Sequence, residues 1–405
     1  MLIRHIKVSG LLSFGPKGID LSMRPLNVLI GPNGSGKSNF LEVLNLIRES
    51  VSPLRSFSGP VSESGGADEW MWKGDWGLDD SPPPASLSWV VSGPGEKFDP
   101  DQGGGVHHSV QFYSYQNELK LADERIEMAL PSRGRKDPWW FYHMNRNGKP
   151  LVAHLQDSTE EVTRIPHDKL VPGASILTQV RSPNRYEVFR YLEEQYSSIQ
   201  LYRDWSFGPH AQIRKPNMPD DRADSLGRAG LNLAAVAASM SSRVKKQVVT
   251  GMQILYPDVR DVRVRPAPGG TLKLYLEEGD EMEIPASRLS DGTLRYLALL
   301  LILLNPKPAP LIVIEEPELG LHPDVIPAVA KLLIDASQRT QLVVTTHSRM
   351  LIDALGDDPE CVVVCEKQEG ESIFERLDRK QMAAWLEKYS LGDLWSKGEI
   401  GGNRW

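Results

Sequence analysis

Short continuous apolar runs mark the beginning and the last third of the chain. Residues 26–30 (LNVLI), 311–314 (LIVI) and 342–344 (LVV) are rich in strand formers and carry no charge. Such runs are typical of central strands that are buried on both faces of a parallel sheet. Residues 361–365 (CVVVC) are expected to form another such strand, whereas residues 2–8 (LIRHIKV) alternate between apolar and polar side chains and indicate a half-buried strand.

The middle of the chain has two other patterns. Between residues 86 and 165, short alternating runs are separated by Gly, Pro and Asp clusters, which predicts an antiparallel meander. Residues 186–196 and 226–255 then show the i, i+3, i+4 apolar spacing of helices. Three strands are expected after them, at 259–264, 272–276 and 281–284, with Pro-Gly-Gly at 268–270 as a hairpin turn.

The strongest local motif is GPNGSGKS at residues 31–38, which matches the phosphate-loop pattern G-x-x-x-x-G-K-[ST]. It lies between the strand predicted at 26–30 and a segment with helical spacing, residues 39–47. Glycines let successive N–H groups turn inward and cradle phosphate oxygens, and the start of the helix adds its positive dipole end. In this pattern Lys37 reaches the β- and γ-phosphates, and Ser38 offers a hydroxyl to Mg²⁺.

A glycine- and serine-rich turn with a chance lysine is the alternative interpretation of this motif. It is disfavoured because all four fixed positions and both flanking elements agree. The motif therefore predicts nucleotide binding, but it does not indicate what the energy is used for. The expected nucleotide contacts are Gly31, Pro32, Asn33, Gly34, Ser35, Gly36, Lys37, Ser38 and Asn39.

The bulk composition narrows the class of protein. The 405 residues are 40% hydrophobic and 24% charged, which is ordinary for a soluble globular protein. The net charge of −7 means that any contact with nucleic acid must come from a local basic patch. The longest apolar run, at 296–304, is too short to span a bilayer, and residues 1–10 lack a signal-peptide core. The two cysteines, Cys361 and Cys365, are expected to be buried thiols in a reducing cytoplasm.

One stretch has the composition of such a patch. Residues 132–150 contain five basic side chains and one aspartate, interleaved with the aromatic run 139–142. This mixture can bind nucleic acid through phosphate contacts and base stacking. It is more often an amphipathic hairpin with a solvated basic face, and both interpretations stay open. A second aromatic cluster, at 70–76, is expected to pack its loop onto the core.

Four further motifs follow the phosphate loop in order. LSDGT at 289–293 precedes an apolar helix and offers a second anion-binding surface. An apolar strand then ends in Glu315 and Glu316, which places one carboxylate near Mg²⁺ and the other near the attacking water. The turn PELGLHP at 317–323 comes next, and TTHS ends the following strand with His347, which can contact the γ-phosphate. Each motif alone is weak, but their joint order is hard to produce by chance.

With these motifs the sequence resembles the ABC-type ATPase heads of the SMC, RecF and OLD group. The resemblance is strongest to compact, stand-alone predicted ATPases of that group, which share PASRLSDGTLRYLALL and a GEIGGNRW-like terminus. It implies an α/β P-loop NTPase with a mainly parallel central sheet, an antiparallel β subdomain and a helical insertion. The expected division is 1–55 and 257–405 for the two halves of the ATPase core, 56–175 for the β subdomain with its loop, and 176–256 for the helical insertion.

The resemblance also implies that two heads form a homodimer around ATP and hydrolyse it. ATP bound to the phosphate loop of one head would meet Ser290, Asp291 and Gly292 of the other. Glu316 would act as general base or water-positioning residue, and His347 would be the switch histidine, with Lys37 completing the catalytic set.

The resemblance also implies residues that contact Mg²⁺ and residues that contact the adenine ring of ATP. Glu315 would lie beside Mg²⁺, where related ATPases usually carry aspartate, and Gln179 would be a further Mg²⁺ contact. Ser13 and Phe14, in the early turn, would contact adenine. The glutamate at 315 and LSDGT in place of LSGGQ both fit the SMC, RecF and OLD branch better than transporter subunits.

ATP hydrolysis by such a dimer is expected to be coupled to a DNA transaction or a defence-type response. The coupling would act through nucleic acid or through a partner protein encoded nearby. The helical insertion is too short for the coiled-coil arm of SMC proteins. Little chain follows His347, so the nuclease domain of OLD proteins is not expected. A non-catalytic, ATP-dependent assembly switch is the alternative, and a transporter ATPase subunit is less well supported. The sequence does not indicate the biological trigger.

Overall fold

The computed structural model describes residues 1–53, 55–75, 83–94, 104–131, 136–144, 150–156, 159–164, 171, 173–180, 187–203, 205–219, 223–279 and 282–401. The chain divides into two compact units. Unit 1 comprises Met1–Arg24, Gly31–Ile199 and Val363–Arg376, and unit 2 comprises Pro25–Ile30, Gln200–Val362 and Leu377–Trp405. Each unit is therefore assembled from separate stretches of the chain. The division into four segments at residues 55, 175 and 256 stays a prediction.

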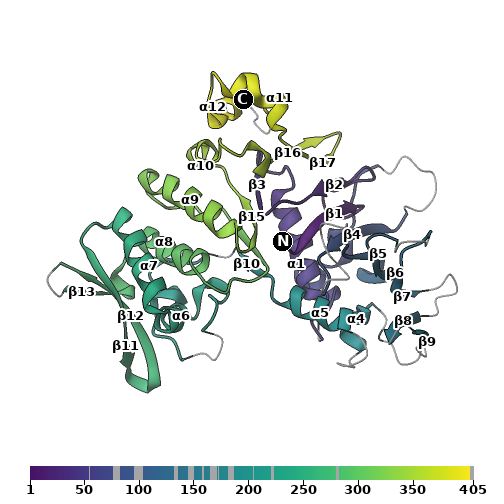
Figure 1. Cartoon of the computed structure of the whole chain (residues 1–405), viewed down its shortest axis with the longest axis horizontal. Helices are drawn as coiled ribbons and strands as arrows, with labels where there is room; N and C mark the ends of the chain where they lie inside the picture. Colours follow the sequence, from purple (N-terminus) through teal and green to yellow (C-terminus); the bar gives the residue numbers. More distant parts are fainter. Residues whose placement is uncertain are drawn as a thin grey trace. The chain divides into compact units, whose positions relative to one another are not determined.

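Unit 1 is built on an eight-stranded antiparallel sheet with the order β2-β1-β4-β5-β6-β7-β8-β9 (Figure 1). Alternate side chains of β4, from Ala85 to Val91, are buried, as a strand with one core-facing side requires. The predicted antiparallel meander is thus confirmed. The strands are β1 (Ile3–Ser9), β2 (Ile19–Ser22), β4 (Ala85–Val91), β5 (Val106–Tyr115), β6 (Glu118–Met128), β7 (Trp140–Met144), β8 (Pro150–Gln156) and β9 (Thr159–Arg164).

Helix α1 (Lys37–Glu49) directly follows the phosphate-loop motif. Its buried face includes Phe40 and Leu44, and it contacts α5 (Glu187–Ser197). The antiparallel hairpin of β16 (Val362–Gln368) and β17 (Glu371–Arg376) brings Phe374 onto Phe40 and Phe14, with ring centroids 5.5 and 5.6 Å apart. The remaining short helices of unit 1 are α2 (Ser58–Glu63), α3 (Ala67–Trp70) and α4 (Ile176–Gln179).

A buried polar cluster ties the sheet of unit 1 to α4. His108 and Glu124 are both completely buried, and His108 Nε2 lies 3.1 Å from Glu124 Oε1. Glu124 also accepts hydrogen bonds from the Ser175 hydroxyl at 2.5 Å and from the Ile176 N–H at 2.8 Å. Because buried polar groups are costly unless they are hydrogen-bonded, this cluster fixes the start of α4 against β5 and β6.

Unit 2 contains the expected parallel sheet. Within it, β10 (Gln200–Tyr202), β14 (Leu311–Glu315), β15 (Gln341–Thr345) and β3 (Leu26–Ile30) are neighbours in that order. All three pairings are parallel. Every residue of β3 and β15 is buried, as the continuous apolar runs predicted. Since the strands are parallel, β3, β14 and β15 all end at the same edge of the sheet.

Two helices of unit 2 begin within or shortly after motifs noted in the sequence. They are α8 (Asp291–Leu303), in which every residue from Thr293 to Leu303 is buried, and α9 (Ile326–Ser337). Two shorter helices, α10 (Arg349–Asp353) and α12 (Leu391–Ser396), pack together, and α11 (Arg379–Leu386) is the short helix predicted near the end of the chain.

A second sheet of unit 2 holds three antiparallel strands, β11 (Val259–Ala267), β12 (Thr271–Glu278) and β13 (Met282–Pro285), beside α6 (Leu233–Ser239) and α7 (Ser242–Leu255) (Figure 1). The predicted Pro-Gly-Gly turn joins β11 to β12. The helical spacing predicted over 226–255 corresponds to α6 and α7, which are two separate helices. Met240 leaves the helical conformation, and the Ser241 hydroxyl then caps α7 by accepting from the Val244 N–H.

The two aromatic clusters lie on the core where they are described. Trp70 and Trp72 are buried, as expected for a loop packed onto the core, and Trp76 lies outside the described residues. In the 132–150 stretch, Trp139, Phe141 and Tyr142 are buried. Their burial favours the hairpin interpretation over base stacking, although Arg133, Arg135, Arg146 and Lys149 lie outside the described residues. Among the described helices, none has the length and apolar character needed to cross a membrane.

Candidate functional site

The phosphate-loop motif forms a tight turn that only glycine fits at two points. Gly31 and Gly36 have φ values of 150° and 97°. A Cβ on Gly31 would lie 2.1 Å from the Cys365 carbonyl oxygen, and one on Gly36 would lie 2.2 Å from the Ser372 hydroxyl. Both the backbone conformation and the close neighbours therefore exclude a side chain, which explains the glycines of the motif in packing terms.

Lys37 lies inside this turn. Its Nζ donates to the carbonyl oxygens of Gly31 at 2.7 Å and Pro32 at 3.0 Å, and the side chain is 7% exposed. The Ser35 hydroxyl is buried and has no hydrogen-bond partner among the described residues, while Ser38 is exposed. A buried ammonium, an orphaned hydroxyl and the N-terminus of a 13-residue helix together fit a phosphate group.

A serine pair supports the start of α1. The Ser13 hydroxyl accepts from the Asn39 amide at 2.8 Å and from the Ser372 hydroxyl at 2.7 Å, and the Ser372 N–H donates to the Ser13 carbonyl. Ser13 and Asn39 therefore brace the phosphate loop. Ser372 was not anticipated, because a lone buried serine on a late strand gives no sequence signal.

Phe14 does not fit the adenine contact expected of it. The ring has no exposed surface and packs edge-on against Phe374. A base cannot stack on a fully enclosed ring, so this expectation needs correction: Phe14 is a core residue.

Gln179 has a local structural role in this conformation. Its side-chain oxygen accepts from the Val171 N–H at 2.6 Å, and its side-chain nitrogen donates to the Ala174 carbonyl at 2.8 Å. Both ends of the amide are thus committed to the backbone that leads into α4. The arrangement gives no support to the expected Mg²⁺ contact.

The carboxylate motif ends β14 in an unusual conformation. Glu316 has φ of 46°, in the left-handed region that non-glycine residues seldom adopt, and its N–H donates to the Thr345 carbonyl at 3.0 Å. Such a conformation costs on the order of 1–3 kcal/mol and occurs preferentially at functional sites. Glu316 Oε1 lies 3.7 Å from His347 Nε2, so the structure brings together the expected base and the expected switch histidine.

Glu315, the expected Mg²⁺ neighbour, is the last residue of β14. Its Oε2 lies 3.1 Å from Arg203 Nε, and it is paired in register with Thr345 of β15. Within the described residues, no three His, Cys, Asp or Glu side chains cluster closely enough to hold a metal ion by themselves. That is compatible with Mg²⁺, which protein sites of this type bind through few side chains together with phosphate oxygens.

The LSDGT segment forms the N-terminus of α8. The exposed Ser290 caps it by accepting from the Thr293 N–H at 3.1 Å. Asp291 forms an ion pair with the buried Arg214. A Cβ on Gly292 would lie 2.7 Å from the Gly320 carbonyl, so this glycine lets the segment touch the turn that follows the carboxylates.

Two charged residues near these motifs were missed by the sequence analysis. Glu318, within the turn, accepts from the Thr346 hydroxyl at 2.5 Å and from the His347 N–H at 3.1 Å. Burial raises the pKa of Glu318, and these hydrogen bonds oppose the rise. Arg295 of α8 donates to the Leu319 carbonyl at 2.6 Å, and burial lowers its pKa. The third carboxylate of EEPE was the available signal, but the segment was interpreted only as a turn.

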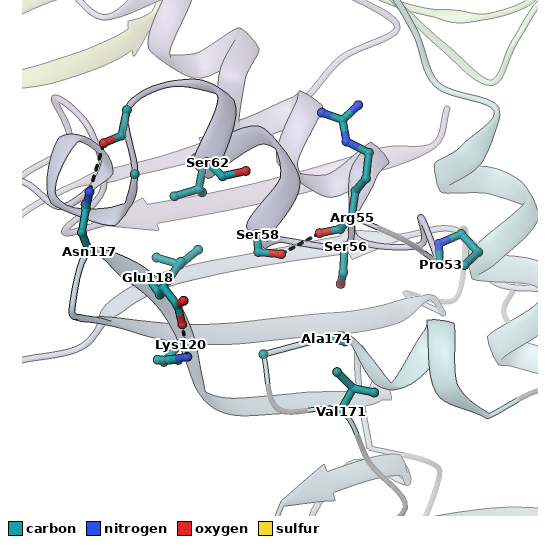
Figure 2. A pocket seen from close by; sticks show the side chains of 15 residues that line it. Pro53, Arg55, Ser56, Ser58, Ser62, Asn117, Glu118, Lys120, Val171 and Ala174 are labelled. Atoms are coloured by element: carbon teal, nitrogen blue, oxygen red, sulfur yellow. Dashed lines mark hydrogen bonds and ion pairs between the residues drawn. The ribbon is translucent and has the colours of Figure 1, made fainter.

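A separate cavity of about 620 Å³ lies in unit 1. Its described lining comes from Pro53 and the 55–66 segment, the turn of the β5–β6 hairpin, and Val171, Gly173 and Ala174. Figure 2 shows its polar lining, in which Lys120 is paired with Glu118 and Asn117 donates to the Gly65 carbonyl. Arg55, its other described basic side chain, is paired with Glu63. None of the motif residues lines this cavity, and its described basic groups are already paired, so we assign it no ligand.

The fold is that of SMC ATPase heads. An SMC head solved in complex with the C-terminal winged-helix domain of ScpA superposes with a TM-score of 0.53 at 15% identity, over 95% of this chain and 100% of that one. The Pyrococcus furiosus SMC head with an extended coiled coil, bound to the C-terminal domain of ScpA, gives 0.51 at 14% identity, over 96% and 99%. At these identities the likeness shows the fold, and it confirms the expected α/β ABC-type head.

The chain belongs to the family described as "AAA domain, putative AbiEii toxin, Type IV TA system", whose sequence profile matches residues 26–92 and 116–353. The Old nuclease of Escherichia phage P2 is 23% identical over 390 residues, which cover 90% of this chain. The chain spans 59% of the length of that relative. The expected membership of the SMC, RecF and OLD group of ATPase heads is thus confirmed.

Proposed function

We propose that this protein binds ATP with Mg²⁺ and hydrolyses it within a homodimer. The observation that carries the proposal is the pair formed by Glu316 and His347, 3.7 Å apart, with Glu316 held in a left-handed conformation at the end of β14. A carboxylate on a strained backbone, next to an imidazole, is the combination of groups expected where a water molecule is activated.

The phosphate loop would bind the triphosphate. It begins at the residue after β3, and β3, β14 and β15 end at one edge of the parallel sheet, where α/β proteins bind their ligands. Lys37 would exchange its hydrogen bonds to two carbonyl oxygens for hydrogen bonds to phosphate oxygens. The hydroxyl oxygen of the exposed Ser38 would coordinate Mg²⁺. Mg²⁺, when bound, would neutralise charge on the β- and γ-phosphates.

Glu316 would accept a proton from the attacking water, or orient it, and His347 would contact the transferred phosphate. Glu315 would lie beside the metal and exchange its contact with Arg203 for that position. Ser290 and Asp291 are exposed at the start of α8, so they are accessible to a second copy of the chain. We infer that they meet the nucleotide of that copy, as the resemblance implies.

We propose a DNA transaction or a defence-type response as the output. The relation to a phage Old nuclease and the likeness to SMC heads that bind ScpA support a nucleic acid or a partner protein as the coupled component. An ATP-dependent assembly switch without turnover is the competing function.

The deciding experiment measures ATPase rate per molecule against protein concentration, with and without duplex DNA. A rate that rises with concentration and again with DNA supports a dimeric, nucleic-acid-coupled engine. A concentration-dependent rate that is indifferent to DNA points to a protein partner. Absence of turnover at every concentration contradicts the ATPase proposal and leaves the assembly switch.

A further inference from the structure

We infer that Glu318 is a positioning residue that fixes His347 relative to Glu316 through hydrogen bonds to the 346–347 segment. The inference rests on the proposed function, since it concerns the geometry of the proposed hydrolytic pair. The sequence analysis gave Glu318 no role beyond its place in a turn.

Two hydrogen bonds from the switch segment, residues 346–347, converge on the Glu318 carboxylate. Glu318 Oε1 accepts from both the Thr346 hydroxyl and the His347 N–H, at 2.5 and 3.1 Å. The Thr346 hydroxyl in turn accepts from the Ser348 N–H at 2.9 Å. Three consecutive residues that contain the switch histidine are therefore organised around one carboxylate oxygen.

The same carboxylate is tied to Glu316. The turn between them is closed by the Leu319 N–H, which donates to the Glu316 carbonyl at 3.1 Å. The Glu316 N–H also donates to the Thr345 carbonyl, one residue before Thr346. Glu316 and His347 thus belong to two segments that are joined at two positions. At 316–345 the Thr345 hydroxyl and carbonyl both accept from the Glu316 N–H, and at 318–347 the Glu318 carboxylate accepts from the His347 N–H.

Burial of Glu318 carries a desolvation cost, so its contacts are weak evidence for a purely stabilising role. Glu318 Oε2 is buried and has no hydrogen-bond partner among the described residues. A partly buried charge of this kind is weak evidence for stabilisation, because desolvation opposes its favourable contacts. The hydrogen bonds that Glu318 Oε1 accepts from other residues come from Thr346 and His347, and the charge of Arg295 also acts on this carboxylate. The two hydrogen bonds support a role in orienting His347.

The experiment compares Glu318→Ala, which removes the acceptor, with Glu318→Gln, which keeps an oxygen at the Oε1 position. Thr346→Val removes the donor hydroxyl at constant shape, and Thr346→Ser restores it. We expect Glu318→Ala and Thr346→Val to lower kcat by about 10- to 100-fold, the usual effect of losing a supporting hydrogen bond at an active site. Glu318→Gln and Thr346→Ser should remain within about threefold of wild type, and ATP affinity should change by less than about threefold in all four.

The double variant Glu318→Ala/Thr346→Val tests whether the two side chains act as one unit. Since Thr346→Val removes one of the two hydrogen bonds that Glu318→Ala removes, the double variant should lose no more than about threefold beyond Glu318→Ala alone. Asp324→Asn is the matched control, because Asp324 is an exposed carboxylate in the same β14–α9 connection as Glu318. This variant should have the kcat and ATP affinity of wild type. Circular dichroism and thermal melting of each variant separate a loss of kcat from a loss of fold.

The inference is overturned if Glu318→Ala keeps wild-type kcat, or if Glu318→Gln loses as much as Glu318→Ala while both stay folded. It is also overturned if ATP affinity falls in parallel with kcat, because the effect would then lie in binding. Absence of turnover in the wild-type protein has a different meaning, since it removes the proposed function and the inference together.

Discussion

His347 Nε2 and Glu316 Oε1 lie 3.7 Å apart, just beyond direct hydrogen-bonding distance. The two residues reach this position from different strands, and the backbone of Glu316 adopts a left-handed conformation to do so. At this distance both groups can face one phosphate oxygen or water from the same side, although no atom fits between them.

Glu316→Gln removes the proposed base and keeps the shape of the side chain. We expect the hydrolysis rate to fall by about 100-fold or more, because general bases typically contribute 10²- to 10⁴-fold, while ATP binding persists. The variant should therefore accumulate as an ATP-bound dimer, measured by light scattering with and without ATP. Asp335→Asn, an exposed carboxylate on α9, is the control. Hydrolysis at the normal rate would contradict the role assigned to Glu316.

Lys37→Ala removes the ammonium group from the phosphate loop. Hydrogen bonds to charged groups contribute about 1.5–3 kcal/mol, so ATP affinity should fall at least about tenfold in a fluorescent-nucleotide titration. Lys17→Ala changes an exposed lysine of unit 1 that is paired with Glu369 and should bind as wild type does. Equal affinity in the two variants would remove the basis of the nucleotide site.

Gly36→Ala introduces a Cβ at a φ of 97° and 2.2 Å from the Ser372 hydroxyl. The strained backbone alone should lower the free energy of unfolding by about 1–3 kcal/mol, and the clash adds to it. Gly34→Ala is the matched comparison, since Gly34 has φ of 81° but nothing within 4 Å of an added Cβ. Chemical denaturation should find Gly36→Ala clearly less stable. Equal stability would show that the Ser372 contact is unimportant.

Glu318→Gln should change the pH dependence of stability. Burial raises the pKa of Glu318 above its ordinary value of 4.5, so the folded protein binds this proton more readily than the unfolded chain. The stability that this group contributes is complete below pH 4.5 and is lost as the pH rises through the raised pKa. The melting temperature of Glu318→Gln relative to that of wild type should therefore increase as the pH rises from about 4 to about 7. A constant difference over this range would contradict the raised pKa.

Gln179→Ala distinguishes a backbone support from a metal ligand. Loss of its hydrogen bonds to Val171 and Ala174 should lower the free energy of unfolding by about 1 kcal/mol. The Mg²⁺ concentration that half-saturates ATPase activity should stay unchanged. A several-fold rise in that concentration would instead support the role expected from the sequence.

The features predicted correctly are those whose cause is local in the sequence. The apolar runs at 26–30 and 342–344 form buried strands because a strand inside a parallel sheet needs apolar side chains on both faces. The alternation along β4 and the Pro-Gly-Gly turn likewise depend on neighbours within a few residues. Glu316 and His347 meet because β14 and β15 are parallel neighbours that end at one edge of the sheet.

The features that escaped prediction depend on contacts between distant residues. Ser372 supports Ser13 across 359 positions, and no local pattern signals such a bond. Phe14 was expected to contact adenine because the family resemblance places that contact in the early turn, but the packing of Phe374 encloses the ring. The interruption at Met240 was hidden because the helical spacing of apolar residues continues across it, and only the Ser241 cap marks the break.

The contact between Ser13 and Ser372 also has a consequence for protein synthesis. The phosphate loop emerges from the ribosome early, but the β16–β17 hairpin that supports it is translated hundreds of residues later. Until Ser372 has been added, Gly36 lacks the side chain that packs against it, and Ser13, which accepts from Asn39, lacks its hydrogen bond from Ser372. A nascent chain arrested before this hairpin should therefore lack the contacts that support the proposed phosphate-binding loop.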